Sequence, residues 1–543
     1  MLVGVPLSAI IQSAFREGSP FEPGALTLDH VWSFITTERY RAAAANTLII
    51  SVVAVAVAAF FGFTIGWLVE RTDVPFRAPI RTVTLVPYFF PTFIGALGWV
   101  FLGSPGSGLL NVLLRSMNPP FGPFDVNSIY MVGVILGLYL SPLAFILSGS
   151  VISNMDAAME EAASASGAPT LLVIRKIVMP LMAPGIIAAA VLVFIMALQN
   201  FGVPVLLAQP AGNQVLVTQL YTEQAFGVPR YGPGGVIALL LVLALAGLQV
   251  LYYKETAMSQ KFVTVTGKVS RPNTIRLGIA RWPVFVTWLA YATLVVFLPF
   301  GVLFYMSLRP IQTFGGPLTL DNYARIFNDP VLLRALGNSF SYATIGSVLT
   351  ILFALLLVWL NTRADVGFAR ILDGLATVPI AMPGIVLGTA LLWFWVAQPL
   401  PVYGTAVIII LVYVTNFLPI AQRNLSAVML QVSPELEEAA LTSGASPART
   451  FASVTFPLLR TGILSSWLLV WLSMFREMSA VIIVYSIGHE LLSTTLLQLW
   501  QDGDSLTASA IAMVMAAGSL LVVIAVTTLS ARLRIPAAGV ASP

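Results

Sequence analysis

The stretch ANTLIISVVAVAVAAFFGFTIGWLV, residues 45–69, decides the fold of this chain, because it runs for 25 residues without a charged side chain. An α-helix rises about 1.5 Å per residue and the hydrocarbon core of a bilayer is about 30 Å thick, so this run predicts a membrane-spanning helix. A second run, GNSFSYATIGSVLTILFALLLVWLN at residues 337–361, follows 292 positions later and repeats the Asn and the Trp in the same places. The chain is therefore expected to cross a membrane and to be internally repeated.

The composition of the whole chain agrees with a membrane protein. Of its 543 residues, 58% are hydrophobic and only 9% are charged, and the mean hydropathy is +0.91. A soluble domain has about a quarter charged residues, so this chain has too little polar surface for a water-soluble globule. The absence of Cys excludes disulfide scaffolds and Cys-ligated metal sites. Two His and a net charge of +4 argue against a His-rich metal centre and against nucleic acid as a partner.

Eleven apolar runs are long enough to span a membrane. Each is expected to be helical, because backbone groups in hydrocarbon must form their hydrogen bonds within the segment. The runs lie at about 45–69, 79–103, 128–150, 182–208, 233–253, 283–308, 337–361, 371–397, 403–428, 460–485 and 507–529.

Residues 1–15 (MLVGVPLSAIIQSAF) are also apolar, but they are too short to cross hydrocarbon as a helix. A cleaved signal peptide needs a basic N-terminal region, which is missing here. The favoured interpretation is a first span that is truncated at its N-terminus, which brings the total to about twelve spans.

The distribution of Lys and Arg predicts the orientation. If the first span runs from inside to outside, 18 of the 27 basic residues, including all four Lys, fall in cytoplasmic segments and 8 fall outside. The positive-inside rule favours this orientation, which places the C-terminus in the cytoplasm.

The two halves of the chain repeat one unit of six spans. At an offset of 292, Pro87 and Pro91 meet Pro379 and Pro383, and further along Gly167 meets Gly444 at an offset of 277. The 15 residues of difference fall in an outer loop at 104–127. The predicted organisation is a first unit at 1–254, a basic cytoplasmic linker at 255–282 and a second unit at 283–543, and such tandem bundles suit a transport pathway between them.

One cytoplasmic loop occurs in both halves, between the fourth and fifth spans. It reads EEAASASGAPTLLVIRKIVMP at 160–180 and EEAALTSGASPARTFASVTFP at 437–457. Ser433, Pro434 and Glu435 form a helix start, and Gly444 permits a left-handed turn that ends this helix. A second short helix is expected to follow and to end at Pro180 or Pro457.

Both loops fit E-A-A-x3-G-x9-(I/V)-x-(M/F)-P, which resembles the EAA loop of inner-membrane permeases of binding-protein-dependent ABC importers. The resemblance implies an all-α polytopic membrane protein, a type I ABC importer (MetI-like) permease with two tandem six-helix units. In that family the loop helix docks into a groove of the ATPase subunit. The residues that this assigns to ATPase coupling are Glu161, Ala162, Ala163, Gly167, Ile177, Pro180, Glu438, Ala439, Ala440, Gly444, Val454 and Pro457.

The chain has no GxxxxGK[ST] motif. It is therefore expected to be a transport subunit without enzymatic activity or bound cofactor, with ATP and Mg held by two copies of a separate cytoplasmic ATPase. The resemblance further implies a periplasmic solute-binding protein as partner and the bacterial inner membrane as location, with both EAA loops in the cytoplasm.

Toward the ends of the predicted fifth spans, Phe201-Gly202-Val203-Pro204 and Arg476-Glu477-Met478-Ser479 resemble the corresponding stretches of ferric-iron permeases, so ferric iron is the expected substrate. Thiamine, phosphonate and polyamine permeases share the layout and remain alternatives. Gln199, Asn200, Arg476 and Glu477 are candidates for the translocation path, since Arg476 and Glu477 are predicted inside a span where charges are rare. An interhelical salt bridge is the competing explanation for that pair. An ion-coupled secondary transporter with duplicated halves is the alternative from another class, but most of the 23 acidic residues lie in loops.

Overall fold

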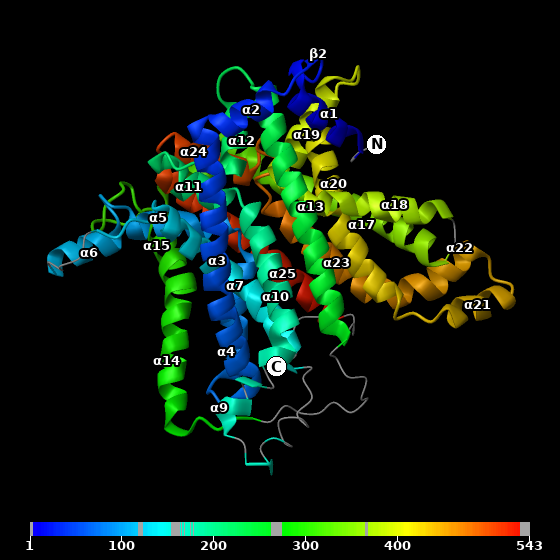
Figure 1. The fold of residues 1–543 in the computed structure, drawn as a ribbon, viewed down its shortest axis with the longest axis horizontal. Coiled ribbons are helices and arrows are strands. Elements are labelled where there is room, and N and C mark those ends of the chain that lie inside the picture. Colours follow the sequence, from blue (N-terminus) through cyan, green and yellow to red (C-terminus); the bar gives the residue numbers. More distant parts are fainter. Residues whose placement is uncertain are drawn as a thin grey trace. The chain divides into compact units, whose positions relative to one another are not determined.

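The computed structural model describes residues 4–117, 123–153, 163, 165–167, 169–173, 175–176, 179–261, 274–363 and 367–532 (Figure 1). Helices dominate, as the apolar runs predict. The elements before the linker are α1 (Gly4–Phe15), β1 (Arg16–Gly18), β2 (Pro23–Leu26), α2 (Asp29–Thr36), α3 (Glu38–Arg71), α4 (Arg77–Phe89), α5 (Thr92–Gly103), α6 (Leu109–Met117), α7 (Ile129–Ser153), α9 (Thr170–Val173), α10 (Met179–Leu198), α11 (Gly202–Leu207), η2 (Gln209–Ala211), α12 (Leu216–Ala225) and α13 (Tyr231–Lys261).

The elements after the linker are η3 (Gly278–Ala280), α14 (Arg281–Ala292), η4 (Thr293–Phe297), α15 (Leu298–Ser307), α16 (Asp321–Asn328), α17 (Pro330–Arg363), α18 (Gly367–Thr377), η5 (Val378–Ala381), α19 (Gly384–Val396), α20 (Ala406–Met429), α21 (Pro434–Thr442), α22 (Pro447–Thr450), η6 (Phe451–Thr455), α23 (Phe456–Phe475), α24 (Leu492–Gln501) and α25 (Ser505–Arg532). The segments η4 and η6 are single π-helical turns within longer helices.

The eleven predicted spans coincide with helices in the structure. Within the described ranges, nine helices are long and apolar enough to cross a membrane, and two further spans are bent pairs of helices. The nine lie at Glu38–Arg71, Ile129–Gly149, Met179–Leu198, Tyr231–Thr256, Gly278–Ser307, Pro330–Arg363, Ala406–Met429, Phe451–Phe475 and Ser505–Thr528. The apolar part of α1 is shorter, at Pro6–Phe15. The chain is thus an all-α multi-pass membrane protein.

The two bent spans break at equivalent prolines, a feature that the expectation of straight helices at 79–103 and 371–397 missed. The pair α4 and α5 is bent by 97°, and Ile371–Ala381 is bent by 115° against α19. Pro91 and Pro383 occupy the N-cap positions of α5 and α19, and the residue before each has extended backbone, Phe90 at φ −104° and Met382 at φ −116°. Proline disfavours helical backbone in the preceding residue, so each span stops there and restarts in a new direction.

The restarted parts of the two bent spans are largely enclosed by protein. All residues from Phe93 to Gly103 in α5 are buried, as are those from Ile385 to Leu391 in α19. A helix that is apolar all round belongs inside the protein, which agrees with the burial of α5 and α19.

The chain divides into two compact units that exchange their first spans. The first-half unit comprises Trp32–Thr222 and Leu240–Tyr305, and the second-half unit comprises Met1–Val31, Glu223–Leu239 and Met306–Pro543. Helix α14 belongs to the first-half unit, where the Trp288 indole N–H donates to Thr84 Oγ1 of α4 at 3.1 Å. Helix α1 packs on α19 in the second-half unit. The domain boundaries predicted from the sequence repeat remain a prediction. The packing units do not follow them, because each unit contains the first helix of the other half of the sequence.

Close helix packing in the second-half unit provides a test of the fold. A Cβ added to Gly388 of α19 would lie 2.2 Å from the backbone oxygen of Ala480, whereas one added to Gly337 of α17 would meet nothing within 4 Å. Gly388→Ala is therefore expected to destabilise the protein by about 1–3 kcal/mol, the usual effect of overpacking. Thermal unfolding of the detergent-solubilised protein, followed by Trp fluorescence, should show a lower midpoint for Gly388→Ala than for Gly337→Ala. Equal midpoints would contradict the close approach of α19 to Ala480.

Candidate functional site

The second EAA loop, residues 433–457, folds as a short exposed helix followed by a turn and a return helix. Ser433 caps α21, since its side chain accepts a hydrogen bond from the Glu435 N–H at 3.3 Å, and Pro434 is the first helical residue. Gly444 follows the helix with φ +89°. The predicted helix start and left-handed turn are both confirmed, and they give the loop its bent shape.

A partly buried ion pair fastens this loop to two spans. Arg363, the last residue of α17, donates from Nε to Glu437 Oε2 at 2.8 Å, and the two side chains are only 14% and 12% exposed. Thr455 of η6 donates to the other oxygen of Glu437 at 2.7 Å, and Arg363 also donates to the backbone oxygen of Val432 at 3.0 Å. Glu437 therefore connects α21 with the end of α17 and the start of the helix that leads into α23.

Sequence reasoning missed this anchor, because it favoured the next residue, Glu438. A signal was available: the repeat aligns Arg71 with Arg363 and Glu160 with Glu437, so an Arg and a Glu recur together in both halves. Arg71 is 1% exposed, and Glu160 lies outside the described residues.

The predicted coupling residues of this loop occupy different environments. Glu438, Ala439 and Gly444 are exposed, while Ala440 and Val454 are partly buried. Pro457 is exposed in the first turn of α23 and does not end a helix, so that expectation was wrong. The π-helical turn η6 precedes it and changes the hydrogen-bond register, which accommodates a residue without an N–H.

The first EAA loop is described only in part. Glu161, Ala162 and Ile177 lie outside the described residues. Ala163 packs against the cluster of Ile152, Val173 and Met182, and Gly167 has the predicted left-handed backbone at φ +79°. Pro180 is the second residue of α10, so in this half too the proline lies at the start of the fifth span.

The candidate path residues lie at the ends of the fifth spans. The spans predicted at 182–208 and 460–485 end at Leu198 and Phe475, and Arg476 is the C-cap of α23. Arg476 and Glu477 therefore lie just after a helix, and their predicted position well inside a span was wrong. Apolarity continues past both helix ends, so hydropathy alone does not reveal where the helices stop.

Asn200 and Glu477 perform the same structural task in the two halves. Asn200 Oδ1 accepts from the N–H of Val203 at 3.0 Å, and Glu477 Oε1 accepts from the N–H of Ala480 at 2.8 Å. Asn200 also donates to Thr92, the first residue of α5, at 3.3 Å. In the second-half unit, a Cβ on Gly384, the first residue of α19, would lie 3.2 Å from Glu477 Oε1.

Both residues thus satisfy backbone N–H groups at the break after the fifth span, next to the break in the second span. Gln199 makes a weaker contact, from Nε2 to the sulfur of Met196 at 3.4 Å. Their role in a translocation path stays a prediction.

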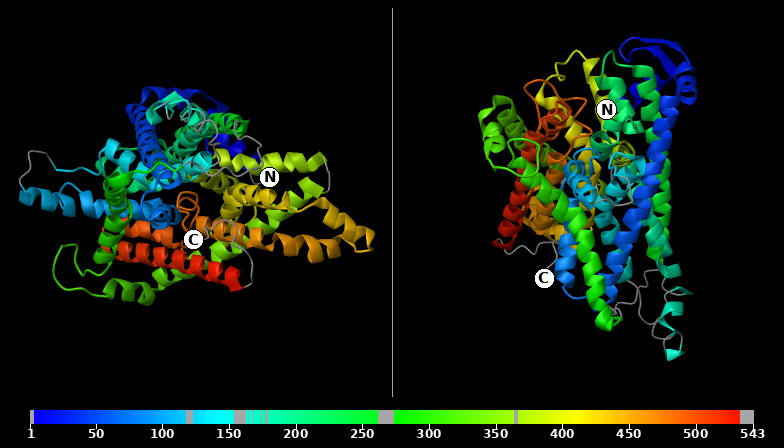
Figure 2. Two further views of the ribbon diagram at one scale, coloured as in Figure 1. Left: turned by 90° about the horizontal axis from the view of Figure 1, so that it is seen from below. Right: turned by 90° about the vertical axis from the view of Figure 1, so that its left-hand side faces the viewer.

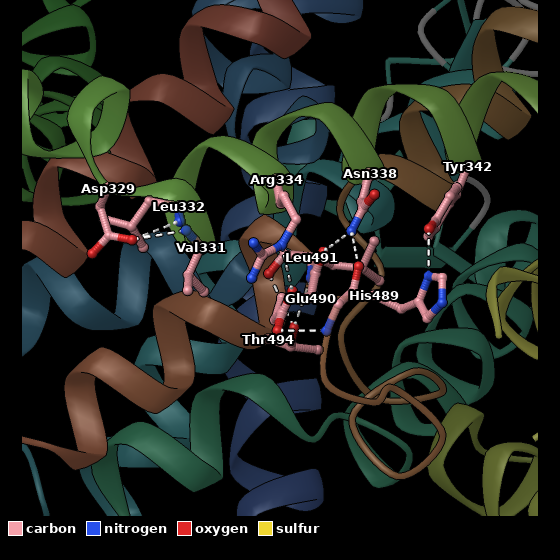
Figure 3. A network of polar contacts seen from close by, with 11 residues as sticks. Asp329, Val331, Leu332, Arg334, Asn338, Tyr342, His489, Glu490, Leu491 and Thr494 are labelled. Carbon is pink, nitrogen blue, oxygen red and sulfur yellow. Dashed lines mark hydrogen bonds and ion pairs between the residues drawn. The ribbon is translucent and has the colours of Figure 1, made fainter. Parts of the chain in front are cut away.

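A polar network fixes the loop after α23 to the first turns of α17 (Figure 3). Asn338 donates to the backbone oxygens of Gly488 and Glu490 at 3.2 and 3.0 Å, and Tyr342 shares a hydrogen bond of 2.7 Å with His489 Nδ1. Arg334 approaches Glu490 at 3.8 Å. His489 is therefore held by protein, as is His30, whose Nε2 lies 3.1 Å from the backbone oxygen of Arg16. Among the residues that the structure describes, no three His, Cys, Asp or Glu side chains cluster in a way that could hold a metal ion.

The anchor predicts a difference between two neighbouring glutamates. Glu437→Gln leaves Arg363 without a counter-charge, and hydrogen bonds to charged groups contribute about 1.5–3 kcal/mol each. The amides of α21 are expected to exchange with deuterium about tenfold faster or more in this variant than in the unmodified protein.

Glu438→Gln changes an exposed neighbour in the same way and is the matched control, with exchange expected to stay unchanged. Hydrogen–deuterium exchange with mass spectrometry on the full chain measures both variants. Equal exchange in both would rule out the anchoring role of Glu437.

Comparison with known proteins places these features in a family. The family model described as "Binding-protein-dependent transport system inner membrane component" matches residues 61–255 and 346–535, one match in each half. A ferric transport system permease protein of Actinobacillus pleuropneumoniae is 26% identical over 527 residues, which cover 96% of this chain and 74% of the relative. A putative ferric transport system permease protein of Haemophilus influenzae is 25% identical over 484 residues, covering 88% and 74%.

Relatives of other kinds match over one half. The spermidine/putrescine transport system permease protein of Haemophilus influenzae is 27% identical over 252 residues, covering 46% of this chain and 86% of the relative. Because the family model matches well over half of the chain, once in each repeat, the chain belongs to the binding-protein-dependent transport system inner membrane components, a family of multi-pass inner-membrane permeases.

Proposed function

We propose that this permease imports ferric iron, which a periplasmic binding protein delivers and which ATP hydrolysis on separate subunits drives across the membrane. The observation that carries the coupling part of the proposal is the exposed, anchored helix α21, whose sequence motif recurs in the first EAA loop. The similarity to ferric permeases over nearly the whole chain supports iron as the substrate.

The exposed surface of α21 suits docking to an ATPase subunit. Only Glu437 and Ala440 are turned toward the protein, while the other side chains of the helix are exposed. These include Leu436 and Leu441, which are 49% and 45% exposed, next to Glu438. Exposed apolar side chains on a short helix outside the spans favour a protein partner, and the two EAA loops favour two copies of it.

The hydrogen bonds of Glu437 can transmit a movement of the loop to other helices of the second-half unit. A movement of α21 acts through Glu437 on Arg363 at the end of α17 and on Thr455, which leads into α23. Helix α23 ends at Phe475, directly before the capped break at Glu477 that lies beside α19. In the proposed mechanism, the closure of two ATPase subunits moves both EAA loops. This movement reaches the broken spans, where the pathway opens alternately to each side of the membrane.

The orientation follows from the charges: the EAA loops, the linker and the C-terminus face the cytoplasm. Another small solute, such as a polyamine, is the second candidate substrate, because a polyamine permease matches one half of the chain. Family membership does not support the ion-coupled alternative.

The docking proposal is tested at the two glycine turns. Proline fixes φ near −65°, which the backbone of Gly167 and Gly444 at φ +79° and +89° excludes. The double variant Gly167→Pro with Gly444→Pro is expected to insert normally and to lose ATPase co-purification by about tenfold or more, a loss of at least about 1.4 kcal/mol. Gly404→Pro places the same strain, at φ +81°, in a turn before α20 and should retain the ATPase. Normal co-purification with the double variant would refute docking through these loops.

The substrate proposal is tested by uptake into proteoliposomes that hold the permease with its ATPase. Labelled ferric iron is expected to accumulate in the vesicles only under two conditions. ATP must be available to the ATPase subunits, and the iron-loaded binding protein must be added. Uptake at the full rate without that protein, or uptake of labelled spermidine in place of iron, would count against the proposal.

A further inference from the structure

Helix α6 (Leu109–Met117) is an addition that the repeat leaves unexplained. It lies in the outer loop at 104–127, whose counterpart between α19 and α20 is short. Its sequence, LLNVLLRSM, places Leu113 and Met117 one turn apart on one face and Arg115 on the opposite face. Leu113 and Met117 are 52% and 76% exposed, and Val112, about 100° around the helix from Leu113, is 47% exposed. The helix therefore presents an apolar face that no described part of the chain covers.

A buried asparagine holds α6 in place. Asn111 is 1% exposed. Its Nδ2 donates to the backbone oxygens of Ser104 and Phe124 at 2.9 and 2.7 Å, and its Oδ1 accepts from the Phe124 N–H at 2.7 Å. The exposed face is thus fixed relative to the end of α5, because the helix is tied on both sides of the loop.

The level of α6 along the spans follows from its neighbours in the first-half unit. Phe124 lies five residues before α7 begins at Ile129. In α7, a Cβ on Gly133 would lie 2.8 Å from Val53 of α3 and 3.1 Å from the backbone oxygen of Ile50. The first turns of α7 are therefore level with the first apolar turns of α3, and the segment bonded to Asn111 leads directly into α7.

Polar contacts between other elements lie at the same height along α3. Asn46 of α3 donates to the backbone oxygen of Gln214 at 3.0 Å, and Asn213 donates to the backbone oxygen of Asn127 at 3.4 Å. Along α3 the exposed side chains change near this level from Arg41 to Leu48 and Val52, the kind of change expected where headgroups give way to acyl chains.

Helix α6 runs across the direction of the neighbouring spans. In Figure 1 it runs crosswise to the upright spans α3 and α14 of the same unit and projects beyond them, and the view from below in Figure 2 shows the same projection. Arg115 is turned back, with its guanidinium donating to the backbone oxygens of Pro105 and Gly106. Further along α3, in its apolar run, Phe60 is 64% exposed.

We propose that α6 is an interfacial helix that lies on the outer leaflet of the bilayer, with Val112, Leu113 and Met117 in contact with phospholipid. A short helix with one apolar face and a basic residue on the other, held level with the end of a span, suits the interfacial plane. Through Asn111 it ties the end of α5, the buried part of the bent second span, to the membrane surface.

The favoured occupant is lipid because the apolar face would otherwise meet water whenever a soluble partner leaves. A solute-binding protein dissociates in each transport cycle and would leave Leu113 and Met117 exposed to solvent, whereas the bilayer is always present beside the spans. Docking of the binding protein on α6 is the rival outcome of the experiment.

The absence of cysteine from the chain makes a direct test possible. The full chain carries one spin label at a time, at Leu113→Cys or Met117→Cys, in vesicles of phosphatidylethanolamine and phosphatidylglycerol. Phe60→Cys serves as the lipid control and Ile487→Cys, at a residue 95% exposed in the loop after α23, as the water control. Accessibility to oxygen and to a water-soluble nickel chelate gives the depth of each label.

The labels at Leu113 and Met117 are expected to lie about 5–10 Å below the headgroup surface, shallower than the label at Phe60 and several-fold less accessible to nickel than the label at Ile487. This result should not change when the solute-binding protein is added. Nickel accessibility equal to that of Ile487 would overturn the proposal, and so would labels that are shielded only after the binding protein is added.

Discussion

The structure depends on one constraint: a backbone that crosses hydrocarbon must form its hydrogen bonds within its own helix, so it can break only where protein supplies other partners. The breaks in this chain obey that constraint. Pro91 and Pro383 open the second spans, and the helices that restart there, α5 and α19, are enclosed by protein. The fifth spans stop at Leu198 and Phe475, where Asn200 and Glu477 accept hydrogen bonds from the freed N–H groups.

Much of the architecture was predictable from sequence because hydropathy, proline and glycine act locally. The apolar runs placed all eleven spans, and the duplicated motif located the second EAA loop, whose helix and turn the structure describes. Ser433 and Gly444 predicted the start of α21 and the turn after it, since capping and positive φ depend on the residue itself.

The features that sequence reasoning missed depend on contacts between distant segments. Hydropathy does not distinguish a straight span from one bent by 115°, and it continues past the ends of α10 and α23. The choice between Glu437 and Glu438 depends on which one faces Arg363, 74 residues away. The recurrence of an Arg together with a Glu in both halves was the sequence signal for this contact, and neither residue alone indicates it.

The exchange of first spans has a consequence for biogenesis. Helix α1 is synthesised long before its packing partner α19, which follows hundreds of residues later in the chain, and α14 must return to helices made long before it. Neither half of the polypeptide is therefore complete as a folding unit, and α1 lacks its final neighbour until the second half has been made. Joining both halves in one polypeptide guarantees that each receives its missing helix, in equal number and from the same molecule.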